Sequence, residues 1–478
     1  MSPMPELAAP DYAFARFLIE RGLAAIYLIG FIVALDQFPA LAGEHGLEPA
    51  PDFLARVRFR DAPSIFHAIR FTDARLRALA AAGAVVSMAL LLGLPEAAPL
   101  PVSMLAWFGL WIAYQSIGNI GGTFYGFGWE TLLLEAGFLA ILLGNDAIAP
   151  PLIVLLAYRW LGFRVEFGAG LIKLRGDPCW RELTCMEFHH ETQPMPNPLS
   201  WFFHHLPRPL HRIEAVGNFV AQLVLPWGLL LPQPFASIAA ILMIVTQLYL
   251  VVSGNYAWLN WITIVVMTSA LADPVLRTFL PIAASAYAPT PPWFEVVVVG
   301  LGILVVGLSY APVLNLLSPH QAMNASFDPF RLVNTYGAFG SVSRVRDEIV
   351  VEGTLADAPG PDAEWREYGF RGKPGDLRRL APQVAPYHDR LDWLMWFLPL
   401  SPIYGERWFV PFLVRLLEND PATIRLLRHN PFPDRPPTLV RARRFRYRFT
   451  SWREWRATGA WWSQAPIGEF VRPIRLRA

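Results

Sequence analysis

The chain has 478 residues, of which 54% are hydrophobic and only 16% are charged. A soluble globular protein of this length is rarely so apolar, so the composition favours an integral membrane protein. The formal net charge is only +2, and the sequence contains neither a phosphate-binding glycine loop nor a serine-hydrolase elbow. We therefore expect no nucleic-acid partner and no soluble nucleotide enzyme or hydrolase.

Long apolar runs predict the membrane-spanning helices, because a helix needs about 20 largely apolar residues to cross the hydrocarbon core. The candidate spans lie near residues 15–36, 78–95, 100–117, 129–145, 151–172, 213–232, 236–254, 256–273 and 293–315. They predict a polytopic α-helical membrane bundle of about eight or nine spans within residues 1–318. The short 129–145 segment carries Glu130 and Glu135, so we expect it to be broken or re-entrant and buried against its neighbours.

The start of the chain and its orientation are harder to interpret. Residues 1–10 lack the pattern of a cleavable signal peptide, so we expect the first apolar helix to direct membrane insertion. Six arginines in the loop 56–77 indicate a cytoplasmic position for that loop. The cysteine pair and the odd span count instead favour a cytoplasmic N-terminus and an external C-terminal domain, which is the orientation we adopt.

A glycine-rich stretch over residues 118–130 lies between two apolar runs and contains Tyr125, Trp129 and Glu130. Glycines let the backbone bend and approach another group closely, so this stretch is a candidate ligand contact. The alternative is close packing of helices through small residues.

Charged residues lie within the apolar segment 151–172 and directly after it. Ionisable groups in hydrocarbon are costly unless they are paired or face a cavity, so we expect Arg164 and Glu166 to have polar partners, with Glu130 or Glu135 as candidates.

Lys173 closes the same segment, seven residues after Glu166, and both side chains can face one side of a helix. A desolvated lysine can act as a base, which makes Lys173 the candidate catalytic residue. The alternative is a lysine that merely extends to the membrane surface from the helix end.

The polar loop 175–212 contains both cysteines and half of the ten histidines. Cys179 and Cys185 are spaced for one small disulfide, which would place the loop outside the cytoplasm. Two free thiols in a reducing compartment are the alternative. His189, His190 and Glu191 are further site candidates, but the following proline breaks the helical zinc-protease pattern. We therefore expect a hydrogen-bonded interface loop without a metal.

Residues 319–478 are rich in arginine and turn residues and predict a soluble α+β domain with an antiparallel sheet. Arg444, Arg446 and Arg448 alternate with Phe445, Tyr447 and Phe449, which is the pattern of a strand with one buried face. We expect the aromatic face to pack inward and the arginines to meet anionic lipid or an acidic client. Residues 348–354 have a similar pattern, and Asp420-Pro421 is expected to begin a helix.

Several long motifs carry a family resemblance. They are Phe124 to Glu130 (FYGFGWE), Phe167 to Trp180 (FGAGLIKLRGDPCW), Glu191 to Pro194 (ETQP), Asn334 to Gly340 (NTYGAFG) and Trp365 to Tyr368 (WREY). On these motifs the chain resembles the lipase maturation factor family and looks like a bacterial member. The resemblance implies a multi-pass protein of the bacterial inner membrane, with an external C-terminal domain and an exported protein as client.

A more distant similarity is to the vitamin K-dependent carboxylase superfamily, which combines a membrane bundle with a largely β external domain. There a lysine after a glycine-rich helix end is the base that acts on a reduced quinone, and Lys173 stands at the matching place. Gly122-Thr123 stands where the carboxylase has an essential histidine. The similarity thus implies a quinone or lipid as ligand but not carboxylation.

Three functions follow as hypotheses. The leading one is a membrane-embedded maturation or folding factor for exported proteins such as lipases. The alternative is a membrane enzyme with Lys173 as base and a quinone or lipid as ligand. The third is a purely structural partner subunit. The sequence identifies no certain cofactor and leaves open whether the protein is an enzyme.

Overall fold

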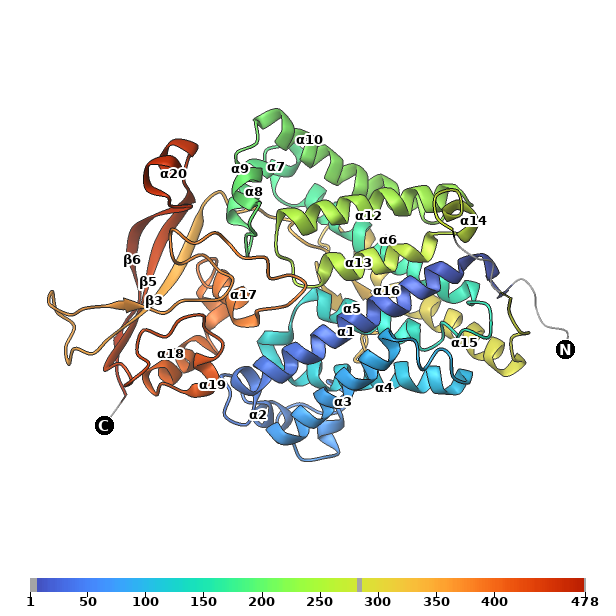
Figure 1. Ribbon diagram of the computed structural model, residues 1–478, viewed down its shortest axis with the longest axis horizontal. Helices are drawn as coiled ribbons and strands as arrows, with labels where there is room; N and C mark the ends of the chain where they lie inside the picture. Colours follow the sequence, from blue (N-terminus) through green and yellow to red (C-terminus); the bar gives the residue numbers. More distant parts are fainter. Residues whose placement is uncertain (1–6, 282–285, 477–478) are drawn as a thin grey trace.

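The fold is known from a computed structural model, which describes residues 7–281 and 286–476. It is elongated, with a helical part at one end and the larger β-sheet at the other (Figure 1). The described N-terminal residues lie at the far end of the helical part, and the last described residues follow β6 of the sheet.

The helical part is built around one long helix, α1 (Ala13–Ala42), which is largely buried and packs on α3, α5 and α13. The other helices are α2 (Ala50–Leu54), α3 (Asp73–Leu91), α4 (Leu100–Ile120), α5 (Gly128–Ala140), α6 (Leu152–Arg175), α7 (Pro178–Arg181), α8 (Met186–Thr192), α9 (Ser200–His204), α10 (Arg208–Phe219), α11 (Leu225–Gly228), α12 (Phe235–Ser253), α13 (Leu259–Met267), α14 (Asp273–Leu276), α15 (Pro292–Leu308) and α16 (Tyr310–Leu317).

Within residues 7–281 and 286–476, five stretches of helix are long and apolar enough to cross a membrane. They are Pro10–Ala42, Asp73–Leu91, Leu100–Ile120, Phe235–Ser253 and Pro292–Leu317. The outward faces of α12 and α15 carry large apolar side chains, such as Val245, Ile303 and Val306, which suit a lipid environment. The predicted helical membrane region is therefore supported, but the predicted eight or nine spans are not confirmed.

The other four predicted spans are not long, uninterrupted apolar helices, and the reason differs among them. Helix α5 has only 13 residues and is mostly buried, and the short apolar helix Leu259–Ala270 also falls below the length of a span. Helix α6 is long enough, but four of its five charged side chains are buried within the protein. The 213–232 segment is interrupted by a π turn at Val220–Val224. Apolar runs alone do not distinguish these buried or interrupted helices from lipid-facing spans.

The C-terminal part contains a four-stranded antiparallel sheet in the order β4-β3-β5-β6. Its strands are β3 (Arg346–Thr354), β4 (Arg366–Glu367), β5 (Leu439–Phe449) and β6 (Trp462–Ile474), and β1 (Ala325–Ser326) pairs with β2 (Asn334–Thr335) separately. The helices are α17 (Arg390–Phe397), α18 (Phe409–Leu417), α19 (Pro421–Ile424) and α20 (Trp452–Thr458). The predicted α+β character and antiparallel sheet are confirmed.

Two features of this part that the local sequence predicted are present in the structure. Asp420 caps α19 as expected, because its side chain accepts a hydrogen bond from the Thr423 amide at 2.8 Å. On β5, Phe445, Tyr447 and Phe449 are buried, as their alternation with arginine predicts.

The arginines of β5 lie on the outer face as expected, but they also form ion pairs that the sequence did not predict. Arg444 and Arg446 both pair with Asp347 on β3, and Arg448 pairs with Glu454 on α20. The arginines do lie on the outer face, but each already has a carboxylate partner. The neighbouring elements supply acids that the β5 sequence does not reveal, but the three arginines stay 39–52% exposed, so contact of this face with anionic lipid or an acidic client stays a prediction.

Candidate functional site

Polar side chains from α6, α8, α10 and α12 meet inside the helical part, near the end that faces the sheet (Figure 1). Helix α6 contributes two of its buried charged residues, Glu166 and Lys173, to this cluster. Because burying charge without partners is costly, the partners of these two groups define the site.

Lys173 lies near the end of α6 and is 4% exposed. Its ammonium group donates to Asn218 Oδ1 at 2.8 Å and Gln222 Oε1 at 2.9 Å, and it lies 4.9 Å from the centre of the Trp180 ring. The side chain therefore points into the protein, so the interpretation of Lys173 as a lysine that extends to the membrane surface is wrong. Its hydrogen-bond partners are neutral amides.

Glu166, two turns earlier on α6, is also buried. Its carboxylate accepts a hydrogen bond from Gln247 Nε2 at 2.5 Å, and Gln247 Oε1 in turn accepts from Asn260 at 2.9 Å. As for Lys173, the hydrogen-bond partners are amides. An amide can serve as donor or acceptor, so these side chains satisfy an acid on one side and an amine on the other.

His189, His190 and Glu191 are consecutive but point to three different places. His189 bonds to the Tyr256 hydroxyl at 2.9 Å, and burial lowers its pKa to about 3, so the ring is neutral at neutral pH. His190 bonds to Glu214, whereas Glu191 accepts from the Phe449 amide at 2.7 Å and so contacts β5. The three residues do not form one ligand set.

The two cysteines form the predicted disulfide, with Cα atoms 4.9 Å apart. Both are buried beside Trp180, the ring that lies against Lys173. Asp177 precedes them and pairs with Arg344 at 2.8 Å, and this pairing lowers the pKa of Asp177 to about 2. The disulfide loop is thus held between the Lys173 cluster and the C-terminal part.

Arg164 and Glu135, two other predicted site residues, lie away from Lys173, at the junction between the two parts. Arg164 forms a buried ion pair with Glu135, as expected for charges within a helical bundle. Glu135 Oε2 also accepts from the Asn334 amide at 3.0 Å and the Tyr336 hydroxyl at 2.7 Å. These bonds join α5 and α6 to the segment that contains β2.

A second ion pair at the junction involves Glu130, which pairs with Arg390 of α17 at 2.7 Å. The Tyr114 hydroxyl donates to the same carboxylate at 2.6 Å, and the Arg390 guanidinium lies 3.5 Å from the centre of the Tyr125 ring. Trp129 lies next to them and donates to His388 Nδ1 at 3.4 Å. The glycine-rich stretch therefore contacts the C-terminal part.

Several residues of these clusters escaped the sequence analysis, among them Asn218, Gln222, Glu214, Gln247 and Arg390. Gln222 and Gln247 interrupt the apolar runs 213–232 and 236–254, so the argument that selected Lys173 also applies to them. Nothing in the local sequence singles out Arg390, because its ion-pair partner, Glu130, lies 260 residues away in the sequence.

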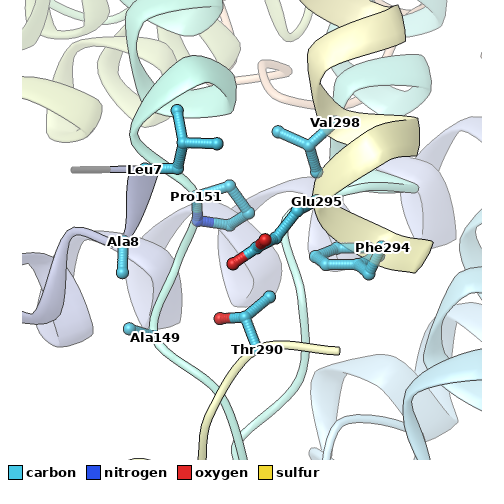
Figure 2. A pocket seen from close by; sticks show the side chains of 8 residues that line it. All are labelled: Leu7, Ala8, Ala149, Pro151, Thr290, Phe294, Glu295 and Val298. Carbon is cyan, nitrogen blue, oxygen red and sulfur yellow. The ribbon is translucent and has the colours of Figure 1, made fainter. Parts of the chain in front are cut away.

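A recess lies at the opposite end of the helical part (Figure 2). Eight residues line it: Leu7, Ala8, Ala149, Pro151, Thr290, Phe294, Glu295 and Val298. The Glu295 carboxylate, from α15, points into this recess between Pro151 and Thr290. None of the predicted site residues contributes to it.

Comparison with known proteins gives consistent matches over both parts. A family profile described as lipase maturation factor transmembrane domain matches residues 14–278, and one described as lipase maturation factor C-terminal domain matches residues 332–472. The chain is 38% identical to lipase maturation factor 1 of Bos taurus, over 98% of this chain and 90% of that protein. It is 38% identical to lipase maturation factor 1 of Homo sapiens (96% and 88% covered) and 27% identical to lipase maturation factor 2 of Homo sapiens (96% and 82%). No solved structure matches the chain. These relatives give no support to the carboxylase alternative.

Proposed function

Because this chain belongs to the lipase maturation factor family, we propose that it is a membrane-embedded maturation factor that helps exported proteins, such as lipases, to fold. The observation that carries the proposal is the extent of the match. Relatives named for lipase maturation align with 96–98% of the chain, which includes both the helical part and the sheet. Similarity confined to a membrane bundle would support only a shared fold.

The junction between the two parts supports this proposal. A folding factor anchored in a membrane must hold its client-binding surface at a defined place relative to the bilayer. The buried Glu130–Arg390 pair joins the two parts directly, and the buried Glu135–Arg164 pair joins them through its hydrogen bonds to Asn334 and Tyr336. Breaking such pairs is costly, so the C-terminal part is held firmly on the helices.

We place residues 1–318 in the inner membrane of a bacterium as a multi-pass region and residues 319–478 on its outer side. The five apolar stretches of helix support the membrane location. The Cys179–Cys185 disulfide supports the outer side for the adjoining loop, because disulfides persist in oxidising compartments. An exported client would meet the C-terminal part there.

Deleting the gene in its host tests the proposal. We expect the activity of exported lipase per mass of secreted lipase to fall, while its transcript level stays the same. Restoring the wild-type gene should restore the activity. Unchanged activity per mass of lipase, together with an unchanged set of exported proteins, would exclude a maturation role.

Lys173 separates the maturation factor from the alternative enzyme that uses a quinone or lipid. A maturation factor should still support lipase activity with Lys173→Met, provided that the variant accumulates to the wild-type level. Lysine-based catalysis should be lost in the same variant. Arg175→Met is the matched control, because Arg175 is an exposed cation on the same helix.

A further inference from the structure

A second buried cluster lies beside the Lys173 cluster and plays no part in the proposed function. It consists of His190 on α8, His211 and Glu214 on α10, and Tyr249 on α12. His211 and Glu214 are three residues apart on one helix, so both face the same side. The side chains of His190 and His211 are 1% and 3% exposed, and that of Glu214 is 9% exposed.

Glu214 is the centre of this cluster. Its carboxylate oxygens bond to His190 Nε2 at 3.1 Å, to His211 Nδ1 at 2.7 Å and to the Tyr249 hydroxyl. In contrast to Glu130 and Glu135, each paired with an arginine, Glu214 has two imidazoles and a phenol as its hydrogen-bond partners within the described residues. A largely buried carboxylate thus contacts two imidazoles, which are neutral metal ligands when unprotonated, and one phenol.

We propose that His190, His211 and Glu214 bind a divalent transition-metal ion, with zinc as the ion to test. Two imidazole nitrogens and one carboxylate oxygen are a ligand set that zinc uses, with a fourth position left for water or another group. The three ligand atoms lie within 4.8 Å of one another. Tetrahedral zinc with bonds of about 2.1 Å needs neighbouring ligand atoms about 3.4 Å apart, so small side-chain rotations suffice.

The fourth position has a candidate occupant. Tyr249 already contacts Glu214, and α12 holds its hydroxyl against the same carboxylate. The ion would link α8 to α10 and, through Tyr249, to α12, beside the disulfide loop. Asp177, Cys179 and Cys185 also lie close together, but their sulfurs are joined to each other and offer no thiolate. The histidine cluster is therefore the stronger site.

Metal content separates this proposal from a purely hydrogen-bonded cluster. The full chain, purified in detergent without chelator and dialysed after zinc addition, should retain about one zinc per chain by mass spectrometry of the metal. His190→Gln and His211→Asn place an amide nitrogen near the position of each imidazole donor, so they keep a hydrogen bond to Glu214 but remove a ligand. Each should lower the zinc affinity by about tenfold or more.

His205→Asn is the matched control, because His205 lies in the same loop and uses Nδ1 to contact the Trp201 carbonyl at 2.7 Å. This variant should retain zinc like the wild type. Zinc should also raise the thermal midpoint of chelator-treated wild type but not that of His211→Asn, because a ligand of the folded state stabilises it. Wild-type protein that keeps no zinc, or equal zinc in all four proteins, would overturn the proposal.

Discussion

Two buried polar regions of this protein differ in the groups that contact their charged side chains. At the junction, Glu135 and Glu130 each meet an arginine, so opposite charges are in contact. Around α6, Lys173 and Glu166 are bonded to neutral amides. Charges paired with each other mainly hold segments together, whereas charges held by neutral groups can still change partners. The junction pairs therefore hold segments together, whereas the α6 cluster contains buried charges whose hydrogen-bond partners are neutral.

Removing one partner of a junction pair should have the largest effect. Arg164→Met leaves Glu135 buried without a cation, which we expect to cost about 3–5 kcal/mol of stability. The double variant Arg164→Met/Glu135→Gln should recover part of this loss, because no buried charge remains uncompensated and the amide oxygen can still accept from Asn334 and Tyr336. Thermal unfolding of the purified proteins in detergent measures both. If Arg164→Met were as stable as the wild type, the junction pair would not be needed to hold the fold together.

The α6 cluster should tolerate the matching change better. Lys173→Met removes one donor from the Asn218 and Gln222 oxygens and leaves no charge of opposite sign in direct contact. We expect a loss of about 1–3 kcal/mol, smaller than that for Arg164→Met, by the same unfolding measurement. Arg175→Met, which loses one hydrogen bond from an exposed side chain to Gln321, should cost no more than about 1 kcal/mol. A larger loss for Lys173→Met than for Arg164→Met would reverse the comparison.

The pH dependence of stability adds a test at the junction, where His388 is enclosed by aromatic rings near Arg390. Burial first, and then Arg390, lowers the pKa of His388 to about 3. The unfolded chain binds a proton near pH 6.5, so the unfolded state takes up protons before the folded state does. Stability from His388 is therefore present above pH 6.5 and lost as the pH falls toward 3.

His388→Phe should remove this contribution. Between pH 7 and 5 the variant should lose about 1–2 kcal/mol less stability than the wild type. His320→Phe, a change at an exposed histidine, is the control and should leave the pH dependence unchanged. Equal pH dependence in all three proteins would show that His388 is protonated to the same extent in the folded and unfolded states.

The smallest effect is expected on the outer face of β5. The side chain of Arg446 is 46% exposed, and Asp347 keeps Arg444 as a second partner. Arg446→Ala should therefore change stability by about 0–1 kcal/mol, and added salt should reduce the difference further. Unfolding at low and high salt measures this. A loss comparable to that of Arg164→Met would mean that exposure does not separate the structural pairs from the surface pairs.

The sequence by itself determined those features whose cause lies within a few residues. The alternation over residues 444–449 established the strand and its buried face, because side chains on a strand alternate between two sides. The six-residue spacing predicted the Cys179–Cys185 bond, and Asp420-Pro421 predicted the start of α19. The composition indicated a membrane protein, because the apolar fraction of a sequence can be counted without any knowledge of the packing.

Only the tertiary structure decided which helices face lipid and which side chains form each polar cluster. An apolar run such as α5 looks like a short span until its neighbours are seen to bury it. Likewise Arg390 reaches Glu130 across 260 residues, and His190 meets Glu214 of another helix instead of its neighbour Glu191. Electrostatic and hydrogen-bond partners are chosen by distance in space, and packing, not the local sequence, determines that distance.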